Sequence, residues 1–163
     1  MSTTNTTNTL TAKPLSPGQQ KLMKMVIKPM SNLNTWLFRM SGGRIGGRFA
    51  GGAPVLLLTT TGRKSGQPRT APLLYLEDKG NMILVASQGG MTNSPQWYHN
   101  LEANPEAEVE LGKDKKKVRS RRATDEEKAA LWPKLVAMYK GYDLYQARTE
   151  RNIPVMILSP VEG

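Results

Sequence analysis

The chain has 163 residues, no cysteine, a single histidine (His99) and a formal net charge of +10. This length predicts one domain with a sizeable core. The composition excludes disulfides, zinc-thiolate sites, iron-sulfur clusters, thiol nucleophiles and any histidine metal cluster. Any chemistry must therefore come from a bound organic cofactor or from oxygen ligands to a metal.

The positive charge is concentrated in the first half of the chain. The first acidic residue is Glu77, so residues 1–76 hold ten Lys and Arg with no Asp or Glu, whereas the rest holds thirteen of each sign. Such an excess raises the local concentration of polyanions: nucleic acid, an anionic membrane surface or a multiply charged cofactor.

The N-terminal part predicts a tail followed by a helix. Residues 1–17 are rich in Thr and Asn with few apolar side chains, which predicts a disordered tail before a single domain at 18–163. Residues 19–39 predict a basic amphipathic helix, or two helices bent at Pro29 with Ser31 or Asn32 capping the second.

This helix has two candidate roles. The favoured role is packing over the core of the domain, which is the more common role of Met-rich amphipathic segments. The alternative is peripheral contact with the inner face of an anionic membrane through Trp36 and Phe38. The segment is too interrupted by charge and proline to span a bilayer, and no secretory signal is convincing, so a cytoplasmic protein is expected.

The central stretch, residues 53–76, predicts a β-hairpin. Strand-like runs at 54–60 and 70–76 flank a glycine-bearing turn that carries Arg63, Lys64 and Arg69. The preceding glycine-rich segment, residues 41–52, predicts a loop. The cationic turn is either an anion-binding corner, since Arg offers a bidentate fork to phosphate or carboxylate, or an ordinary solvated turn.

The rest of the chain predicts further strands and helices. Residues 81–86 read as a third strand in a meander, followed by the polar loop 87–90 and a helix at 96–101 with Ser94 as N-cap. A hairpin at 106–111 and 115–123 places basic residues opposite glutamates. A capping box, Thr124 with Glu127, opens a helix. Tyrosines recur every third residue after it, and 153–158 is an apolar strand. About six strands predict an α+β fold around a small antiparallel barrel.

Several segments, in this order, resemble the deazaflavin (F420)-dependent nitroreductase family of actinobacteria, over roughly residues 20–159. The matching segments are LTTTGRKSGQPR at 58–69, Pro72-Leu73, Ala86-Ser87 with Gly89-Gly90, Pro95 with Trp97-Tyr98, Asn100-Leu101, Ala103-Asn104-Pro105, ATDEE at 123–127, and Tyr139, Tyr142 and Tyr145. The resemblance implies a split β-barrel related to the FMN-binding, pyridoxamine-phosphate-oxidase-like proteins. It also implies that the chain binds the 5-deazaflavin coenzyme F420, whose tail carries a phosphodiester and oligoglutamate.

The resemblance also implies which residues make the site. The expected cofactor-binding residues are Arg63, Lys64, Ser65, Arg69, Thr70, Ala71, Pro72, Val85, Ala86, Ser87, Gln88, Gln96, Trp97, Tyr98, His99, Asn100 and Tyr142. The expected catalytic residues are Ser87, as a hydrogen-bond donor, and Tyr139, Tyr142 and Tyr145, as a wall for the acceptor. No metal is expected.

The implied reaction is hydride transfer from the reduced coenzyme to a quinone, enone or nitroaromatic acceptor. Gln88 replaces a Lys of the family and Leu74 a Tyr, which favours quinone or enone over nitroimidazole. Two alternatives remain: a nucleic-acid-binding basic module, and an FMN-dependent oxidase on the same barrel. Against the first, aromatic residues make up only 6% and are not interleaved with the basic hairpin.

Overall fold

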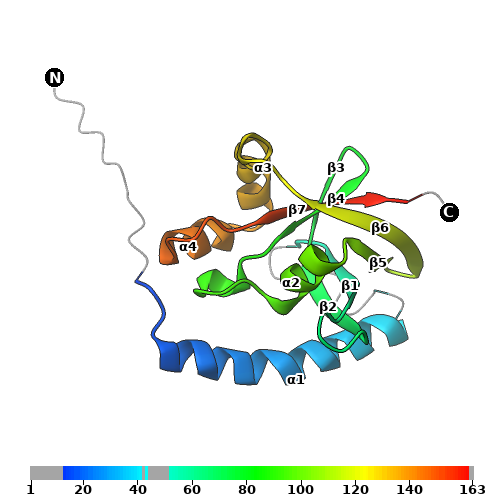
Figure 1. Cartoon of the computed structure of the whole chain (residues 1–163), viewed down its shortest axis with the longest axis horizontal. Helices are drawn as coiled ribbons and strands as arrows, with labels where there is room; N and C mark the ends of the chain where they lie inside the picture. Colours follow the sequence, from blue (N-terminus) through cyan, green and yellow to red (C-terminus); the bar gives the residue numbers. More distant parts are fainter. Residues whose placement is uncertain (1–12, 42, 44–51, 162–163) are drawn as a thin grey trace.

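The computed structural model describes residues 13–41, 43 and 52–161, except for the side chains of 26–32 and 34. Within these residues, strands and helices alternate around one sheet (Figure 1). In chain order the elements are α1 (Pro17–Ser41), β1 (Val55–Thr61), β2 (Pro68–Leu74), β3 (Leu76–Asp78), β4 (Asn81–Val85), the short 3-10 helix η1 (Gln88–Gly90), α2 (Gln96–Ala103), β5 (Glu106–Leu111), β6 (Asp114–Arg122), α3 (Asp125–Met138), α4 (Gly141–Arg148) and β7 (Val155–Pro160).

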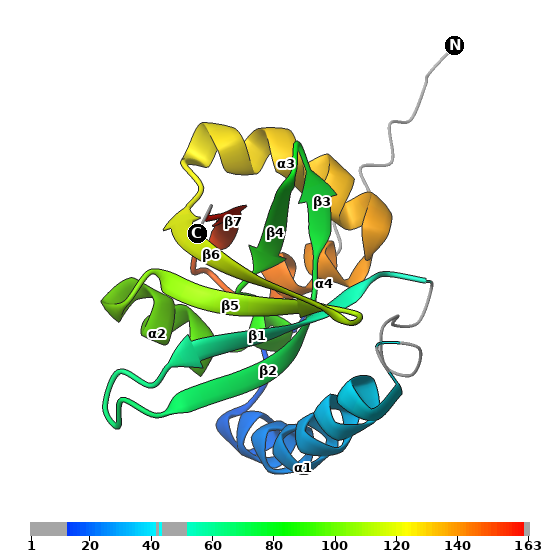
Figure 2. The same ribbon diagram turned by 90° about the vertical axis from the view of Figure 1, so that its right-hand side faces the viewer.

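The strands form one antiparallel sheet in the order β2-β1-β5-β6-β7-β4-β3. β2 and β3 are the two end strands, yet Tyr75 alone separates them in the chain. The sheet must therefore curl until its two ends meet, which Figure 2 shows as strands wrapping around an interior. The predicted α+β antiparallel barrel is confirmed, with β3 as a seventh strand that the sequence reading missed.

Strand β1 is buried on both faces, since the consecutive side chains Leu56, Leu57 and Leu58 are all inaccessible, and this explains its continuously apolar run. Leu56 and Leu58 face the barrel interior with Val109, Val118 and the α2 residue Trp97. The opposite face of β4 and β7 is covered by α3 and α4. Leu56, Leu57 and Leu58 are fully buried. Burying each side chain contributes about 1.5–3 kcal/mol, so this strand is a main source of stability.

α1 is one continuous helix, which confirms the first of the two predicted alternatives; the second, two helices bent at Pro29 with a cap at Ser31 or Asn32, is wrong. A proline inside a helix costs about 3 kcal/mol, and contacts at both ends of α1 offset that cost. Near the C-terminal end, Phe38 is buried and Arg39 Nη2 donates to Glu110 Oε2 at 3.0 Å. Near the N-terminal end, Gln20 Oε1 accepts hydrogen bonds from the Thr92 backbone and hydroxyl. The helix thus packs along the barrel, beside β2 (Figures 1 and 2).

The predicted meander is also wrong at one place. β2 pairs with β1, and the chain then crosses at Tyr75 to form β3, which pairs with β4. The local pattern could not show this, because residues 70–76 are apolar throughout. Most of the predicted tail (1–17) and of the glycine-rich loop (41–52) lies outside the described residues.

Two predictions in the second half are confirmed. The capping box is complete, since Thr124 and Glu127 each accept a hydrogen bond from the other's backbone. The hairpin β5–β6 places Glu106, Glu108 and Glu110 opposite Arg119, Lys117 and Lys115. This register pairs much of the basic charge of β6 with carboxylates, as expected from the sequence.

Candidate functional site

Strand β4 is paired with the chain that precedes it over a short region only, and the two segments separate on one side of that region. β3 and β4 are in register at Leu76 and Ile83. Before Tyr75, β2 pairs with β1, and beyond Val85 the chain leaves β4 for η1. We call the region between residues 69–74 of β2 and residues 86–91 after β4 the split, because β2 pairs with β1 and is not a strand partner of the other segment. Most of the predicted cofactor-binding residues outside α2 lie on its two sides.

On the β2 side, alternation sorts the predicted residues between the two faces of the strand. Ala71 pairs with Leu58 and shares its inward face, whereas Thr70 and Pro72 lie on the outer face. The Thr70 hydroxyl shares a hydrogen bond of 2.8 Å with the Thr59 hydroxyl. Pro72 lacks an N–H group and suits an end strand whose outer edge has no partner strand.

On the other side, residues 86–91 form a tight turn. Ser87 is buried, with 8% of its surface exposed, and Gln88, Gly89 and Gly90 all have positive φ. The amides of Gly90 and Met91 donate to the carbonyls of Ser87 and Gln88. A Cβ on Gly90 would lie 2.6 Å from the Tyr145 carbonyl oxygen, so only glycine lets α4 pack this closely on the turn.

Arg151 holds this turn, and the sequence reading missed it. Its guanidinium donates to the carbonyls of Ala86, Ser87 and Met91 and to the Ser94 hydroxyl. Ser94 is therefore not the cap of α2: Pro95 occupies the N-cap position without a side-chain bond. Nothing in the local sequence separates Arg151 from the other arginines, because its partners lie 57 to 65 positions away.

The hairpin tip presents three exposed cations, Arg63, Lys64 and Arg69. Arg63 donates to the buried Asn100 Oδ1 from its backbone (3.2 Å) and from Nη1 (3.1 Å), and Asn100 in turn donates to Thr60. Ser65 accepts from Arg69 Nη2 at 3.4 Å. Within the described residues, no ion pair joins these three cations to a carboxylate.

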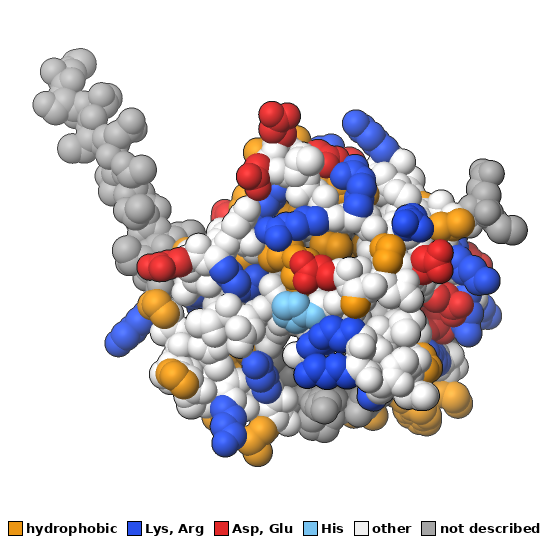
Figure 3. Space-filling model, viewed as in Figure 1, with side chains coloured by type: hydrophobic (Ala, Val, Ile, Leu, Met, Phe, Trp, Pro, Cys, Tyr) orange, Lys and Arg blue, Asp and Glu red, His pale blue; other side chains and the backbone are white. Residues whose placement is uncertain are grey.

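The structure places the predicted α2 residues in different settings. Trp97 and Tyr98 are buried inside the barrel core, and Asn100 anchors the hairpin tip. Gln96 is exposed and His99 is half-buried, with Nδ1 3.6 Å from Glu102 Oε2. In Figure 3 the histidine (pale blue) lies beside a group of Lys and Arg side chains. Of this segment, Gln96 and His99 are the side chains with appreciable exposure.

The three tyrosines form one cluster, although they do not share a helix. Tyr139 caps the C-terminus of α3, and Tyr142 and Tyr145 belong to α4. Their ring centroids lie 5.0–6.4 Å apart, and the hydroxyls of Tyr139 and Tyr145 share a hydrogen bond of 2.8 Å. This apolar cluster also contains Leu74 of β2 and Val85 of β4, so it adjoins the split.

Two tyrosines of the cluster, Tyr142 and Tyr145, have raised pKa values. Burial, followed by the hydrogen bond to Tyr139, raises the pKa of Tyr145 to about 12. Burial is also the main reason that the pKa of Tyr142 is raised. Because both folded-state pKa values lie above the ordinary tyrosine value, this contribution to stability is complete below about pH 10 and is lost at higher pH.

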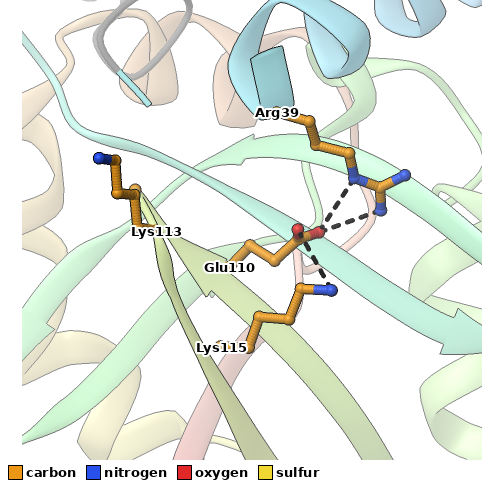
Figure 4. A pocket seen from close by; sticks show the side chains of 5 residues that line it. Arg39, Glu110, Lys113 and Lys115 are labelled. Carbon is orange, nitrogen blue, oxygen red and sulfur yellow. Dashed lines mark hydrogen bonds and ion pairs between the residues drawn. The ribbon is translucent and has the colours of Figure 1, made fainter. Parts of the chain in front are cut away.

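Two hollows on the surface lie away from the predicted residues. One, of about 520 Å³, is lined by Arg39, Glu110, Gly112, Lys113 and Lys115. Figure 4 shows Arg39 and Lys115 converging on Glu110, so the ion pairs that fasten α1 to β5 occupy it. The other, of about 530 Å³, lies between α3 and the residues after α4. There Lys128 donates to Gln146, Asn152 and the Ile153 carbonyl, a structural tie.

α1 crosses from one side of the split to the other. Met23 lies against Gly89 on the turn, and the helix runs past β2 to the ion pair of Arg39. Its other face is exposed, with Leu22, Met25, Leu33, Trp36 and Met40 each more than half accessible. In the described part of the chain, no helix has the length and apolar character needed to cross a bilayer.

Comparisons with known proteins agree on a single group. A sequence model described as F420H(2)-dependent quinone reductase matches residues 30–160. A putative F420H(2)-dependent quinone reductase of Mycobacterium tuberculosis is 46% identical over 117 residues, covering 72% of this chain and 98% of that protein. A second M. tuberculosis F420H(2)-dependent quinone reductase is 42% identical over 130 residues, covering 78% and 87%.

Two solved structures share the fold and much of the sequence. One, described as an F420-H2 dependent reductase, is 40% identical with a TM-score of 0.61, covering 65% of this chain and 94% of that chain. The other, described as a domain-swapped dimer, has the same identity and TM-score, covering 65% and 80%.

Proposed function

Because the chain belongs to the F420H(2)-dependent quinone reductase family, we propose that its split is where reduced coenzyme F420 passes a hydride to a quinone. The observation that carries this proposal is the location of the predicted residues. Strand β2, the turn 86–91 and the tyrosine cluster come from distant parts of the sequence and meet at the split. The chain is thus an F420-dependent oxidoreductase whose chemistry we assign to this place.

The residues present fit the coenzyme. Its phosphodiester and glutamate carboxylates are anionic, and the hairpin tip offers Arg63, Lys64 and Arg69 without carboxylate partners in the described chain. A guanidinium binds such groups by two parallel hydrogen bonds. When bound, the coenzyme supplies the hydride.

The chain's own residues orient the reactants and provide a proton donor. Ser87 belongs to a turn that Arg151 and α4 hold in place, and we assign its hydroxyl the role of donating a hydrogen bond to an oxygen of the acceptor. The hydroxyls of Tyr142 and Tyr145 can act as neutral hydrogen-bond donors, and burial raises the pKa of both groups further above neutral pH. α1, which crosses the split, limits access of water to it.

The acceptor preference is tested directly by turnover. We expect purified protein mixed with reduced F420 and menadione, a quinone, to restore the oxidised deazaflavin absorption band faster than the protein-free mixture. A nitroaromatic, tested in parallel, should react more slowly, because Gln88 and Leu74 depart from the nitroreductase pattern. Recovery with the nitroaromatic alone would contradict the quinone assignment.

Membrane contact through α1 stays a prediction. The exposed apolar side chains of α1 and its exposed Lys21 and Lys24 are the features that an interfacial helix needs. We propose that this exposed face of α1 binds an anionic membrane surface, next to the bilayer in which quinones dissolve. Equal sedimentation with anionic and neutral vesicles, or none with either, would count against it.

A further inference from the structure

Arg151 lies between α4 and β7, and its guanidinium is surrounded by backbone carbonyl oxygens. Nη2 donates to the Ser87 carbonyl at 2.7 Å and to the Ala86 carbonyl at 3.2 Å. Nη1 donates to the Ala86 carbonyl and to the Ser94 hydroxyl, each at 3.2 Å, and Nε donates to the Met91 carbonyl at 2.9 Å. One side chain thus holds four residues on the loop that runs from β4 to α2.

The charge of Arg151 has no carboxylate partner in the described part of the chain. Burial lowers its pKa from the ordinary value, but a guanidinium remains protonated in proteins. A half-buried cation held by three carbonyl oxygens and one hydroxyl therefore contacts the turn that carries Ser87.

The turn needs such support, because its backbone is unfavourable. Gln88 has φ of 45°, and it is followed by Gly89 and Gly90, also with positive φ. A non-glycine residue in this region costs of order 1–3 kcal/mol, so the conformation persists only where the surroundings fix it. α4 supports the turn from one side through Gly90, and Arg151 donates to its carbonyls from another.

We propose that Arg151 is a positioning residue for hydride transfer, which fixes the turn 86–94 so that the Ser87 hydroxyl is held at the split. The proposal rests on the proposed function of the split. Arg151 touches neither reactant and acts through Ser87. Lysine at this position keeps a positive charge, but its single nitrogen cannot reproduce the planar fork that reaches three carbonyls and a hydroxyl.

The test compares Arg151→Lys with Arg121→Lys, the same substitution at an exposed arginine that pairs with Glu127 on the surface. For Arg151→Lys, we expect kcat for quinone reduction to fall about 10- to 100-fold while KM for the quinone changes less than about 3-fold, as misplacement of a reacting group predicts. Arg121→Lys should leave both constants unchanged. Equal constants in the two variants would overturn the proposal.

A double-mutant cycle separates positioning from general stability. Ser87→Ala combined with Arg151→Lys should lower kcat no further than the larger single loss, because both changes remove the same placed hydroxyl. Multiplied losses, or losses that follow the melting temperature, would show that Arg151 only stabilises the fold. Hydrogen–deuterium exchange needs no turnover: amides 86–94 should exchange faster in Arg151→Lys alone. This measurement tests whether Arg151 fixes the turn, and unchanged exchange there would overturn the proposal even if the wild-type protein reduces no quinone.

Discussion

Replacing Arg63 and Lys64 together by glutamine is expected to raise the Kd for coenzyme F420 by about 10- to 100-fold. Hydrogen bonds to charged groups contribute about 1.5–3 kcal/mol each, and exposure at the hairpin tip reduces this. The Arg63 backbone amide still reaches Asn100, and glutamine retains much of the side-chain bulk, so the melting temperature should change little. The Kd of each protein for F420 is measured by fluorescence titration at low and at high salt.

The matched control is Lys113→Gln with Lys115→Gln, which removes two cations from the β5–β6 turn. This pair lowers the net charge by the same amount but lies at the hollow filled by the Glu110 ion pairs. Its Kd should rise much less, by the general loss of charge alone. Similar losses in both pairs would mean that the net charge, and not a corner at the hairpin tip, attracts the coenzyme.

Replacing Gly90 by alanine is expected to lower the melting temperature by about 10 °C and to reduce turnover severely. The new methyl group would meet the Tyr145 carbonyl at 2.6 Å and Arg148 Cβ at 3.0 Å, and the φ of 76° already disfavours alanine. Strain and overlap together should cost about 2–4 kcal/mol, since neither neighbour is a flexible side-chain end. α4 and the tyrosine cluster would have to move away from the turn.

Gly80→Ala is the control for Gly90→Ala. Gly80 has φ of 82°, but nothing lies within 4 Å of the position of its Cβ. This variant therefore carries the backbone strain without the overlap, and we expect it to lose about 1 kcal/mol of stability and to retain activity. A Gly90→Ala variant as stable and as active as Gly80→Ala would show that close packing of α4 on the turn is dispensable.

The sequence predicted the elements that local chemistry decides. The apolar run of β1, the alternation of β5 and β6, and the capping box at Thr124 each depend on residues within a few positions of one another. The tyrosine spacing also brought three rings together, although Tyr139 ends one helix and Tyr142 lies in the next. There the tertiary packing, and not a shared helix face, makes the cluster.

The features that the sequence did not predict depend on contacts between residues far apart in the chain. The chain crosses at Tyr75 because β2 pairs with β1, whereas β3, which follows Tyr75, pairs with β4. Arg151 reaches partners that no sequence spacing indicates. The burial of Trp97 and Tyr98 in the barrel core was also not evident from the sequence, and their expected contact with the coenzyme stays a prediction. Pro29 left open whether the segment forms one helix or two, and the structure has the single helix α1, with contacts at both of its ends.

The measurement that tests the central claim most directly is hydrogen–deuterium exchange of the protein with and without oxidised F420. We predict slower exchange at residues 69–74 and 86–91, the two sides of the split, and at the hairpin tip that carries Arg63 and Lys64. Protection confined to the hollow at Glu110 or to the hollow beside Lys128 would place the coenzyme elsewhere. That result would contradict the assignment of hydride transfer to the split.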